Sequence, residues 1–268
     1  MTNHHKMISI ANTWQDTWQI LTEHFFKFLF VSAVPLIIVY LFSWSTVGSF
    51  LVSIKTLSDP RQIFSFSSGF IYFAVVAIVI IGVIQIWSSI AILVTVANHR
   101  SVKLSEIFSK SLEFFWSFIL MSMLIGLIIM IGMLISYLLV TMISIIIGLF
   151  SLGILNRYYI ISDFLPSIFT AIISVFLLFS PYFLVDAKTN AWVAIRKSFR
   201  LVKGFFWPIA IRLIIAYAML STISFICKFI PYVGYYLAIL ICIPTLAIYT
   251  FVLYKDLITN SNALKYTE

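Results

Sequence analysis

The chain has 268 residues, of which 62% are hydrophobic and only 10% are charged, and its formal net charge is +8. Soluble domains carry about 25% charged residues, and a water-soluble fold of this size could not bury so much apolar surface in one core. The composition therefore excludes a soluble globular protein and indicates a chain that crosses a lipid bilayer as helices, which satisfy their own backbone hydrogen bonds.

The N-terminal segment does not have the pattern of a cleaved signal peptide. Residues 1–24 are polar and mixed in charge, and the first apolar run starts near Phe25 and reaches almost to Ser53. This run is longer than the apolar region of a signal peptide, and no small-x-small cleavage site ends it. We interpret it as an uncleaved first span.

Six apolar segments are long enough to cross a bilayer, which takes about 20 residues. Polar and turn residues separate them, as at Asp59-Pro60 and at Pro231 to Gly234. The predicted fold class is all-α: one integral membrane domain, 1–268, that is a polytopic transmembrane helical bundle of about six spans. The predicted spans are 28–53, 70–97, 116–140, 165–186, 207–230 and 232–254.

The third span allows more than one interpretation. Residues 116–155 are apolar almost throughout, which is too long for one upright helix at 1.5 Å rise per residue. The segment could be one tilted helix that extends beyond the bilayer, a span followed by an interfacial segment near 143–155, or two spans. The distribution of charge argues against two spans, because an extra span would place the basic segment 188–203 outside.

The basic residues predict the orientation of the chain. With six spans, 13 of the 17 Lys and Arg residues fall on the side of the two termini, and four fall on the other side, namely Lys55, Arg61, Arg157 and Lys228. Basic residues concentrate on the cytoplasmic side of membrane proteins. We therefore expect both termini in the cytoplasm, and we attribute the net positive charge to topology rather than to nucleic-acid binding.

A short aromatic motif recurs along the chain. Phe25-Phe26, Phe114-Phe115 and Phe205-Phe206 are spaced by 89 and 91 residues, and a short amphipathic stretch precedes each of them. The pattern predicts three parallel repeats of an interfacial helix followed by a two-span hairpin, at about 8–97, 101–186 and 188–257. The apolar residues of the three stretches are Trp14, Trp18 and Leu21, then Leu104, Phe108 and Leu112, then Ile195, Phe199 and Val202.

The third stretch contains the best candidate for a binding site. Arg196, Arg200 and Lys203 lie at i, i+4 and i+7, beside the apolar residues of the same helix. This is the pattern of a helix that lies in the membrane interface, where each basic residue gains about 1 kcal/mol near anionic lipid. It predicts contact with a lipid headgroup or with an acidic partner; the alternative is simple anchoring.

Two of the predicted spans, the fifth and the second, contain polar side chains. Arg212, about five residues into the fifth span, could serve as a counter-charge for a headgroup or substrate, or could reach the interface with its long side chain. Gln85 and Ser89 share one face of the second span with Gly82. They could line a polar path, or could form a close helix–helix contact with an interhelical hydrogen bond.

The sequence contains no recognisable catalytic constellation. It has no GxSxG, Walker A or dinucleotide motif, and neither Cys227 nor Cys242 has a CxxC or metal-type spacing. Three of the four histidines lie near the N-terminus without a carboxylate or cysteine cluster. We therefore predict no catalytic residues, no metal site, no cofactor and no enzymatic activity.

Several segments resemble a known family. These are Ile8 to Lys27, then Ser180-Pro181-Tyr182-Phe183-Leu184-Val185-Asp186 with the basic segment Ala194 to Val202, and the ending Tyr249 to Tyr254. Together they resemble the YciC-type family of uncharacterised, multi-span inner-membrane proteins of Gram-negative bacteria. The resemblance implies a bacterial inner-membrane location and a similar number of spans, but no reaction. The 180–203 motif is also similar to one in the membrane domain of some glycerophosphodiester phosphodiesterases, whose soluble catalytic domain this chain lacks.

Two functional hypotheses follow from these patterns. The first is a non-enzymatic envelope protein that contacts anionic membrane lipid, or an unidentified protein partner, through its basic amphipathic helices. The alternative is a transporter or channel for a small molecule or a lipid. For that alternative we expect a cavity at the centre of the repeats, lined by Arg212 and Gln85.

Overall fold

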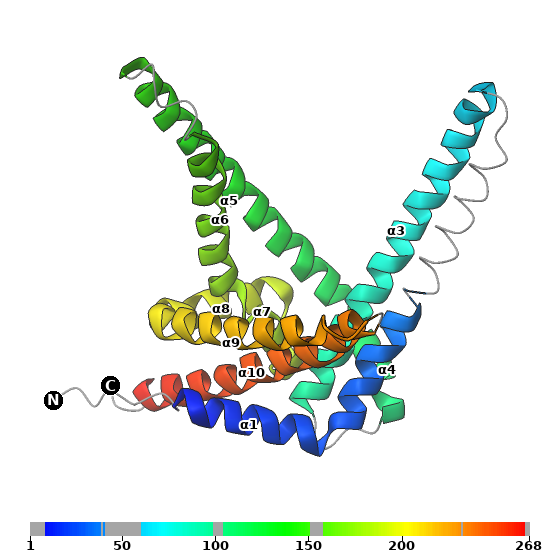
Figure 1. The fold of residues 1–268 in the computed structure, drawn as a ribbon. Coiled ribbons are helices and arrows are strands. Elements are labelled where there is room, and N and C mark those ends of the chain that lie inside the picture. Colours follow the sequence, from blue (N-terminus) through cyan, green and yellow to red (C-terminus); the bar gives the residue numbers. More distant parts are fainter. Residues whose placement is uncertain are drawn as a thin grey trace. The chain divides into compact units, whose positions relative to one another are not determined.

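The structure is a computed structural model that describes residues 9–38, 40, 60–98, 104–150, 158–231 and 233–265. Every regular element in these ranges is a helix, and they contain no strand, which confirms the all-α class (Figure 1). The helices are α1 (Ile10–Glu23), a segment at Phe25–Ile38, α3 (Pro60–Ala97), α4 (Leu104–Glu113), α5 (Phe115–Phe150), α6 (Tyr158–Leu177), α7 (Ser180–Asp186), α8 (Ala191–Lys203), α9 (Phe206–Cys227) and α10 (Gly234–Lys265).

Five helical stretches are long and apolar enough to cross a bilayer: Val75–Ala97, Phe115–Met142, Leu165–Asp186, Phe206–Cys227 and Gly234–Asn260. α1 and the helix Phe25–Ile38 meet at a bend of 77°, and they make a sixth if the bent pair is one span. The chain is therefore a multi-pass membrane protein. The predicted first span, 28–53, lies mostly outside the described residues, so its full length and the count of six stay predictions.

The third predicted span is one unbroken helix. α5 runs for 36 residues, from Phe115 to Phe150. At 1.5 Å per residue it is about 54 Å long, whereas the hydrocarbon core of a bilayer is about 30 Å thick. Of the alternatives for residues 116–155, the structure therefore has one continuous helix as far as Phe150, which is long enough to extend beyond the bilayer unless it is strongly tilted.

The helix that contains the second span is longer than the predicted span of 70–97, because α3 begins at Pro60, whereas the stretch apolar enough to cross a bilayer is Val75–Ala97. Proline suits the first position of a helix, where its missing N–H would have no partner and its fixed φ is already helical. The break predicted at Asp59-Pro60 thus has a helix start at Pro60, while Asp59 lies outside the described residues. The apolar run of α3 and its polar N-terminal extension form one helix.

The fourth predicted span is broken near its end. α6 ends at Leu177, and α7 restarts at Ser180 with Pro181 in its first turn. Proline cannot donate a backbone hydrogen bond, so it belongs at a helix start rather than in a helix interior. The break lies beside α8, which packs against both α6 and α7.

The chain divides into two compact units. The first unit comprises residues 1–13, 116–219 and 249–268, and the second comprises 14–115 and 220–248. In the second unit, α4 packs on α3 through Phe108, whose ring lies 4.9 Å from that of Trp87. The unit boundaries fall at other residues than those of the predicted repeats, and the three-repeat architecture stays a prediction.

Close packing in the first unit depends on a small residue of α5. Gly132 is buried against α6, and a Cβ built on it would lie 2.5 Å from the Cδ1 atom of Ile173 and 3.3 Å from the ring of Phe169. Small residues allow such close approach between membrane helices, where packing rather than water exclusion drives association. The opposite side of α5 exposes large apolar residues such as Leu134 and Leu138, as expected for a surface that faces lipid.

The structure divides each predicted amphipathic stripe into a packed edge and an exposed edge. In α1, Leu21 is buried and Trp18 is exposed. In α4, Ile107 and Ser111 are buried instead of the predicted Leu112, which is exposed.

Candidate functional site

α8 carries the predicted basic site, and its inner face is well anchored. Five residues of that face are buried: Ala191, Ala194, Ile195, Ser198 and Val202. The Ser198 hydroxyl donates to the carbonyl of Phe176 at 2.7 Å and accepts from the backbone N–H of Phe179 at 3.2 Å. These are backbone groups that the break between α6 and α7 leaves without helical partners. Ser198 therefore fixes α8 on that break.

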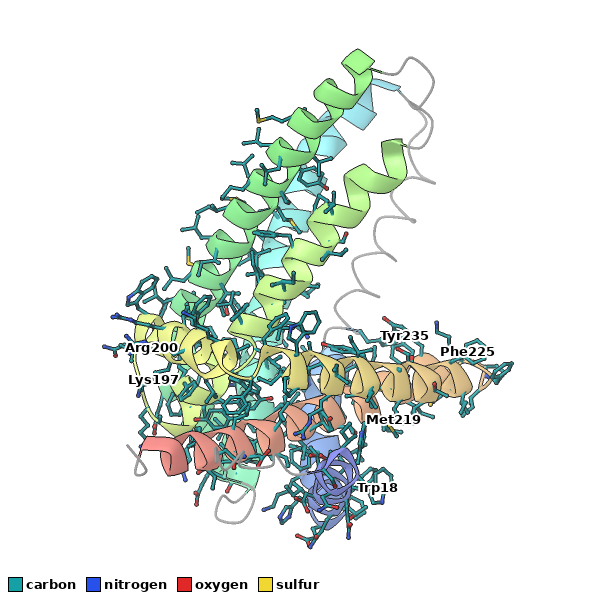
Figure 2. All side chains as sticks on the ribbon, turned by 90° about the vertical axis from the view of Figure 1, so that its left-hand side faces the viewer. Trp18, Lys197, Arg200, Met219, Phe225 and Tyr235 are labelled. Atoms are coloured by element: carbon teal, nitrogen blue, oxygen red, sulfur yellow. The ribbon has the colours of Figure 1, made fainter. Side chains whose placement is uncertain are left out.

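The outer face of α8 brings the three predicted basic residues together. Arg196, Arg200 and Lys203 are all exposed and line one groove of about 520 Å³. Lys197 is also exposed, and its Nζ atom lies 5.9 Å from the ring centre of Phe183. Figure 2 shows Arg200 and Lys197 at the exposed side of this helix.

The floor of the α8 groove is apolar. Ile128 of α5 and Ile173 and Leu177 of α6 line it, and Trp192 and Phe199 of α8 stand at its edge, 60% and 48% exposed. Among the described residues that line the groove, three are cations and none is a carboxylate. A groove with a basic rim and an apolar floor is complementary to an anionic group that is joined to hydrocarbon.

Phe199 departs from the predicted stripe of Ile195, Phe199 and Val202. Ile195 and Val202 are buried, but Phe199 remains at the surface, where its ring stacks on Phe176 at 4.7 Å between centroids. Because successive residues of a helix turn by about 100°, a stripe of three such residues is wide enough to meet protein at one edge and lipid at the other. Phe199 thus belongs with the basic residues rather than with the packed face.

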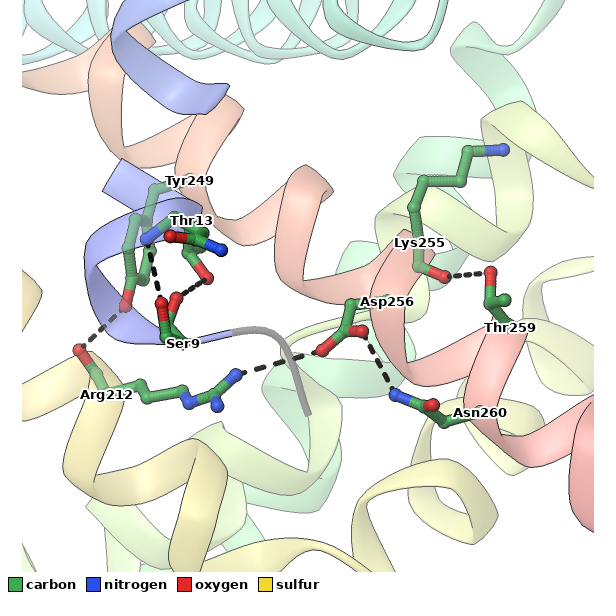
Figure 3. Close-up of polar contacts among 9 residues, drawn as sticks. Ser9, Thr13, Arg212, Tyr249, Lys255, Asp256, Thr259 and Asn260 are labelled. Carbon is green, nitrogen blue, oxygen red and sulfur yellow. Dashed lines mark hydrogen bonds and ion pairs between the residues drawn. The ribbon is translucent and has the colours of Figure 1, made fainter. Parts of the chain in front are cut away.

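Arg212 lies in a different environment from the other three basic residues. Its side chain is buried in the first unit, and its Nη1 atom is 3.8 Å from Oδ2 of Asp256 on α10 (Figure 3). Asn260 donates to the other carboxylate oxygen of Asp256 at 3.0 Å, and the hydroxyl of Tyr249 donates to the carbonyl of Arg212 at 3.4 Å. Since its counter-charge comes from within the protein, we leave Arg212 out of the headgroup site proposed below.

Sequence reasoning missed Asp256, because the last span was predicted to end at 254. The helix continues, and the apolar stretch with Asp256 inside it reaches Asn260. Asp256 could have been identified from the cost of burying a charge, because a buried arginine needs a carboxylate partner. Asp256 directly follows the last apolar run, with Asn260 one helical turn later.

A second polar cluster fixes α7 to α10. Lys255 donates to both oxygens of Asp186, at 2.8 and 2.9 Å, and the hydroxyl of Tyr254 donates to Asp186 at 3.3 Å. Deeper in the unit, the hydroxyls of Tyr182 and Thr250 are hydrogen-bonded to each other. These contacts hold α7, against which α8 packs, and so contribute to the placement of the α8 groove.

Gln85 and Ser89 lie in the second unit. The Ser89 hydroxyl donates to the carbonyl of Gln85 at 2.9 Å, inside its own helix. Both residues line a pocket of about 420 Å³, together with Ser32, whose buried hydroxyl has no hydrogen-bond partner among the described residues. The described residues that line this pocket do not include Arg212, and the central cavity expected for a transporter stays a prediction.

The chain matches no protein-family model, no curated protein and no solved structure. The resemblance to the YciC-type family thus stays an expectation of the sequence. The same holds for the inner-membrane location and for the orientation of the termini.

Metal-binding side chains are dispersed in the part of the chain that the structure describes. It contains no group of three or more His, Cys, Asp or Glu residues that could hold a metal ion. Cys227 and Cys242 are free thiols. His4, His5 and His99 lie outside the described residues, and His24 lies in the turn between α1 and the following helix.

Proposed function

We propose that this membrane protein is non-enzymatic and holds the headgroup of an anionic lipid on the outer face of α8. The observation that carries the proposal is that Arg196, Arg200 and Lys203 converge on one groove with an apolar floor. On the resemblance and the distribution of charge, we place the groove at the cytoplasmic leaflet of a bacterial inner membrane.

The chemistry of the groove supports binding rather than simple anchoring. Arginine pairs with phosphate through two parallel hydrogen bonds, and charge-assisted bonds of this kind are the strong ones. Three cations on one rim add about 1 kcal/mol each near anionic lipid. Trp192 stands at the same rim, and tryptophan, whose ring has an apolar body and a polar N–H, favours the level of the headgroups.

The rigidity of α8 supports the same proposal. A groove that is already shaped before the lipid arrives loses less conformational entropy on binding. The buried face of α8 and the two hydrogen bonds of Ser198 fix the helix on α6 and α7. Only the long basic side chains need to become ordered around a headgroup.

The test is native mass spectrometry of the purified full-length protein, with identification of the lipids that stay bound. We expect wild type to retain an anionic phospholipid and Arg196→Ala/Arg200→Ala to bind it about 30-fold more weakly, which corresponds to about 2 kcal/mol for two basic residues. The matched control is Lys110→Ala/Lys228→Ala, which removes the same charge outside the groove and should retain the lipid.

Two results would contradict the proposal. One is the same anionic lipid at the same occupancy in wild type and in Arg196→Ala/Arg200→Ala. The other is an equal loss in the control variant, which would mean that net charge alone attracts the lipid. A soluble acidic protein that copurifies with wild type and is lost from Arg196→Ala/Arg200→Ala, in place of a lipid, would assign the groove to a protein partner.

A further inference from the structure

A second groove lies beside the first, between α6 and α9. Its volume is about 650 Å³, and it is lined by residues such as Ile168, Ile172 and Val175 of α6 and Ala210, Ile214 and Tyr217 of α9. None of the described residues that line it is charged. The hydroxyl of Ser174 donates to the carbonyl of Thr170, at 2.8 Å within α6, so the polar group of this serine is already satisfied. Apart from the Tyr217 hydroxyl at one end, the described lining is therefore apolar and suits a hydrocarbon chain.

One ring separates the two grooves. Phe176 lines both of them, and it is stacked between Phe199 of α8, at 4.7 Å, and Phe206 of α9, at 5.3 Å. The two grooves therefore meet at Phe176, and the basic rim of α8 lines the first of them.

The α9 wall of the second groove is about as long as one leaflet of a bilayer is thick. This wall runs from Phe206 to Tyr217, which is about 16 Å at 1.5 Å per residue. Half of a hydrocarbon core of about 30 Å is about 15 Å. Trp207 and Ile214 on this wall are 72% and 67% exposed, and apolar side chains left so open in a membrane span face lipid chains.

We infer that the two grooves bind one anionic phospholipid with two acyl chains. The headgroup lies against Arg196, Arg200 and Lys203, the first chain passes over Ile128 and Ile173, and the second chain lies between α6 and α9 on the other side of Phe176. The inference rests on the proposed function and adds the class of ligand, a diacyl lipid rather than a single-chain one.

The protein should prefer a diacyl lipid over a single-chain lipid because the second acyl chain is tethered to a headgroup that is already bound. In a bilayer the acyl chain of any lipid can cover an apolar groove, so the hydrophobic effect at the groove alone adds little to the affinity for one particular lipid. When the headgroup is held at the rim, the second chain of the same molecule is present at high effective concentration. A single-chain lipid with the same headgroup gains only the first contact, so the diacyl lipid should be retained more strongly by on the order of tenfold.

The experiment compares phosphatidylglycerol with lysophosphatidylglycerol, each added to the delipidated full-length protein in detergent and measured by native mass spectrometry. Ala171→Trp fills the second groove from α6, at an exposed position where the ring needs no repacking. Ala210→Leu fills it more mildly from α9. Leu134→Trp, on an exposed position of α5 outside both grooves, is the control for adding a large apolar ring.

We expect wild type and Leu134→Trp to retain the diacyl lipid about tenfold more strongly than the single-chain lipid. Ala171→Trp and Ala210→Leu should lower diacyl retention toward the single-chain level and leave single-chain retention unchanged. Equal retention of the two lipids by wild type, or an unaltered preference in both groove variants, overturns the two-chain inference. The variant Arg196→Ala/Arg200→Ala distinguishes failure of the two-chain inference from failure of the proposed function. If this variant loses both lipids, the headgroup site stands even where the two-chain inference fails. If it retains both lipids, the headgroup site and the two-chain inference are both wrong.

Discussion

Arg212 and Asp256 form a buried charge pair that joins α9 to α10. Their side chains are 10% and 8% exposed, and Asn260 donates a hydrogen bond to the carboxylate. Burying two charges is costly, and their attraction offsets the cost only while both partners are present. Removing one partner should therefore lower the stability much more than removing both.

At the residue scale we predict that Asp256→Asn destabilises the protein by about 3–5 kcal/mol, because it removes the carboxylate charge that lies 3.8 Å from the buried guanidinium of Arg212. Thermal unfolding in detergent should show a clearly lower Tm. The double variant Arg212→Met/Asp256→Leu should recover most of the loss, because it removes both charges and keeps apolar volume.

The matched control for this prediction is the exposed pair of Asp186 and Lys255. The Lys255 side chain is 49% exposed, so Lys255→Met should cost less than about 1 kcal/mol. A Tm for Asp256→Asn no lower than that of Lys255→Met would contradict the prediction and would place water or another charge beside Arg212.

Residue spacing predicted only part of the candidate site. Arg196, Arg200 and Lys203 could be assigned to one face from their positions on a helix, since helical periodicity is local. Ser198 could not be assigned, because its partners Phe176 and Phe179 are 22 and 19 positions away and depend on where α6 breaks. Asp256 was missed for the same reason, since its partner lies on another helix.

Helix packing is decided by shape as much as by apolarity. α5 is apolar around its whole circumference, so hydropathy alone does not say which side meets α6. The structure selects the side of Gly132, where the absence of a side chain lets Ile173 and Phe169 approach. Small residues mark such contacts in membrane bundles, because large apolar residues are as stable against lipid as against another helix.

At the scale of the helix pair we predict that Gly132→Val destabilises α5 against α6 by about 1–3 kcal/mol, since the valine must displace Ile173 and Phe169. Gly126→Val, on an exposed position of the same helix where an added Cβ meets nothing within 4 Å, is the control and should be near neutral. Thermal unfolding in detergent compares them. Equal Tm values for the two variants would mean that the contact at Gly132 yields without cost.

The whole molecule is a multi-pass helical protein whose basic residues are unevenly distributed along the sequence. The predicted cytoplasmic side carries 13 of 17 Lys and Arg residues, among them the basic residues of α8. Such a bias sets the orientation of short-looped membrane proteins. The orientation matters for the proposed function, because it decides which leaflet supplies the lipid.

For the whole chain we predict that a cysteine at Thr189, just before α8, reacts with a membrane-impermeant thiol reagent only from the cytoplasmic side. A cysteine at Phe229, in the turn after α9, should react only from the opposite side. Both are introduced in a Cys227→Ser/Cys242→Ser background and measured in intact and lysed cells. Labelling of Thr189→Cys in intact cells would show that the topology is the reverse of the predicted one and that the α8 groove lies at the outer leaflet.

Sequence by itself determined the class of this protein, its all-helical membrane spans, the helix boundaries near Pro60 and Pro231 and the basic face of α8. These follow from composition and from periodicity, which act over a few neighbouring residues and over the thickness of a bilayer.

Only the tertiary structure decided how α6 ends against Ser198, that Arg212 faces Asp256, and that Phe176 divides two grooves beside the basic rim. In an apolar sequence almost every helix face can meet lipid or protein, so hydropathy does not choose between them. The choice comes from shape and from the few polar groups that must find partners inside.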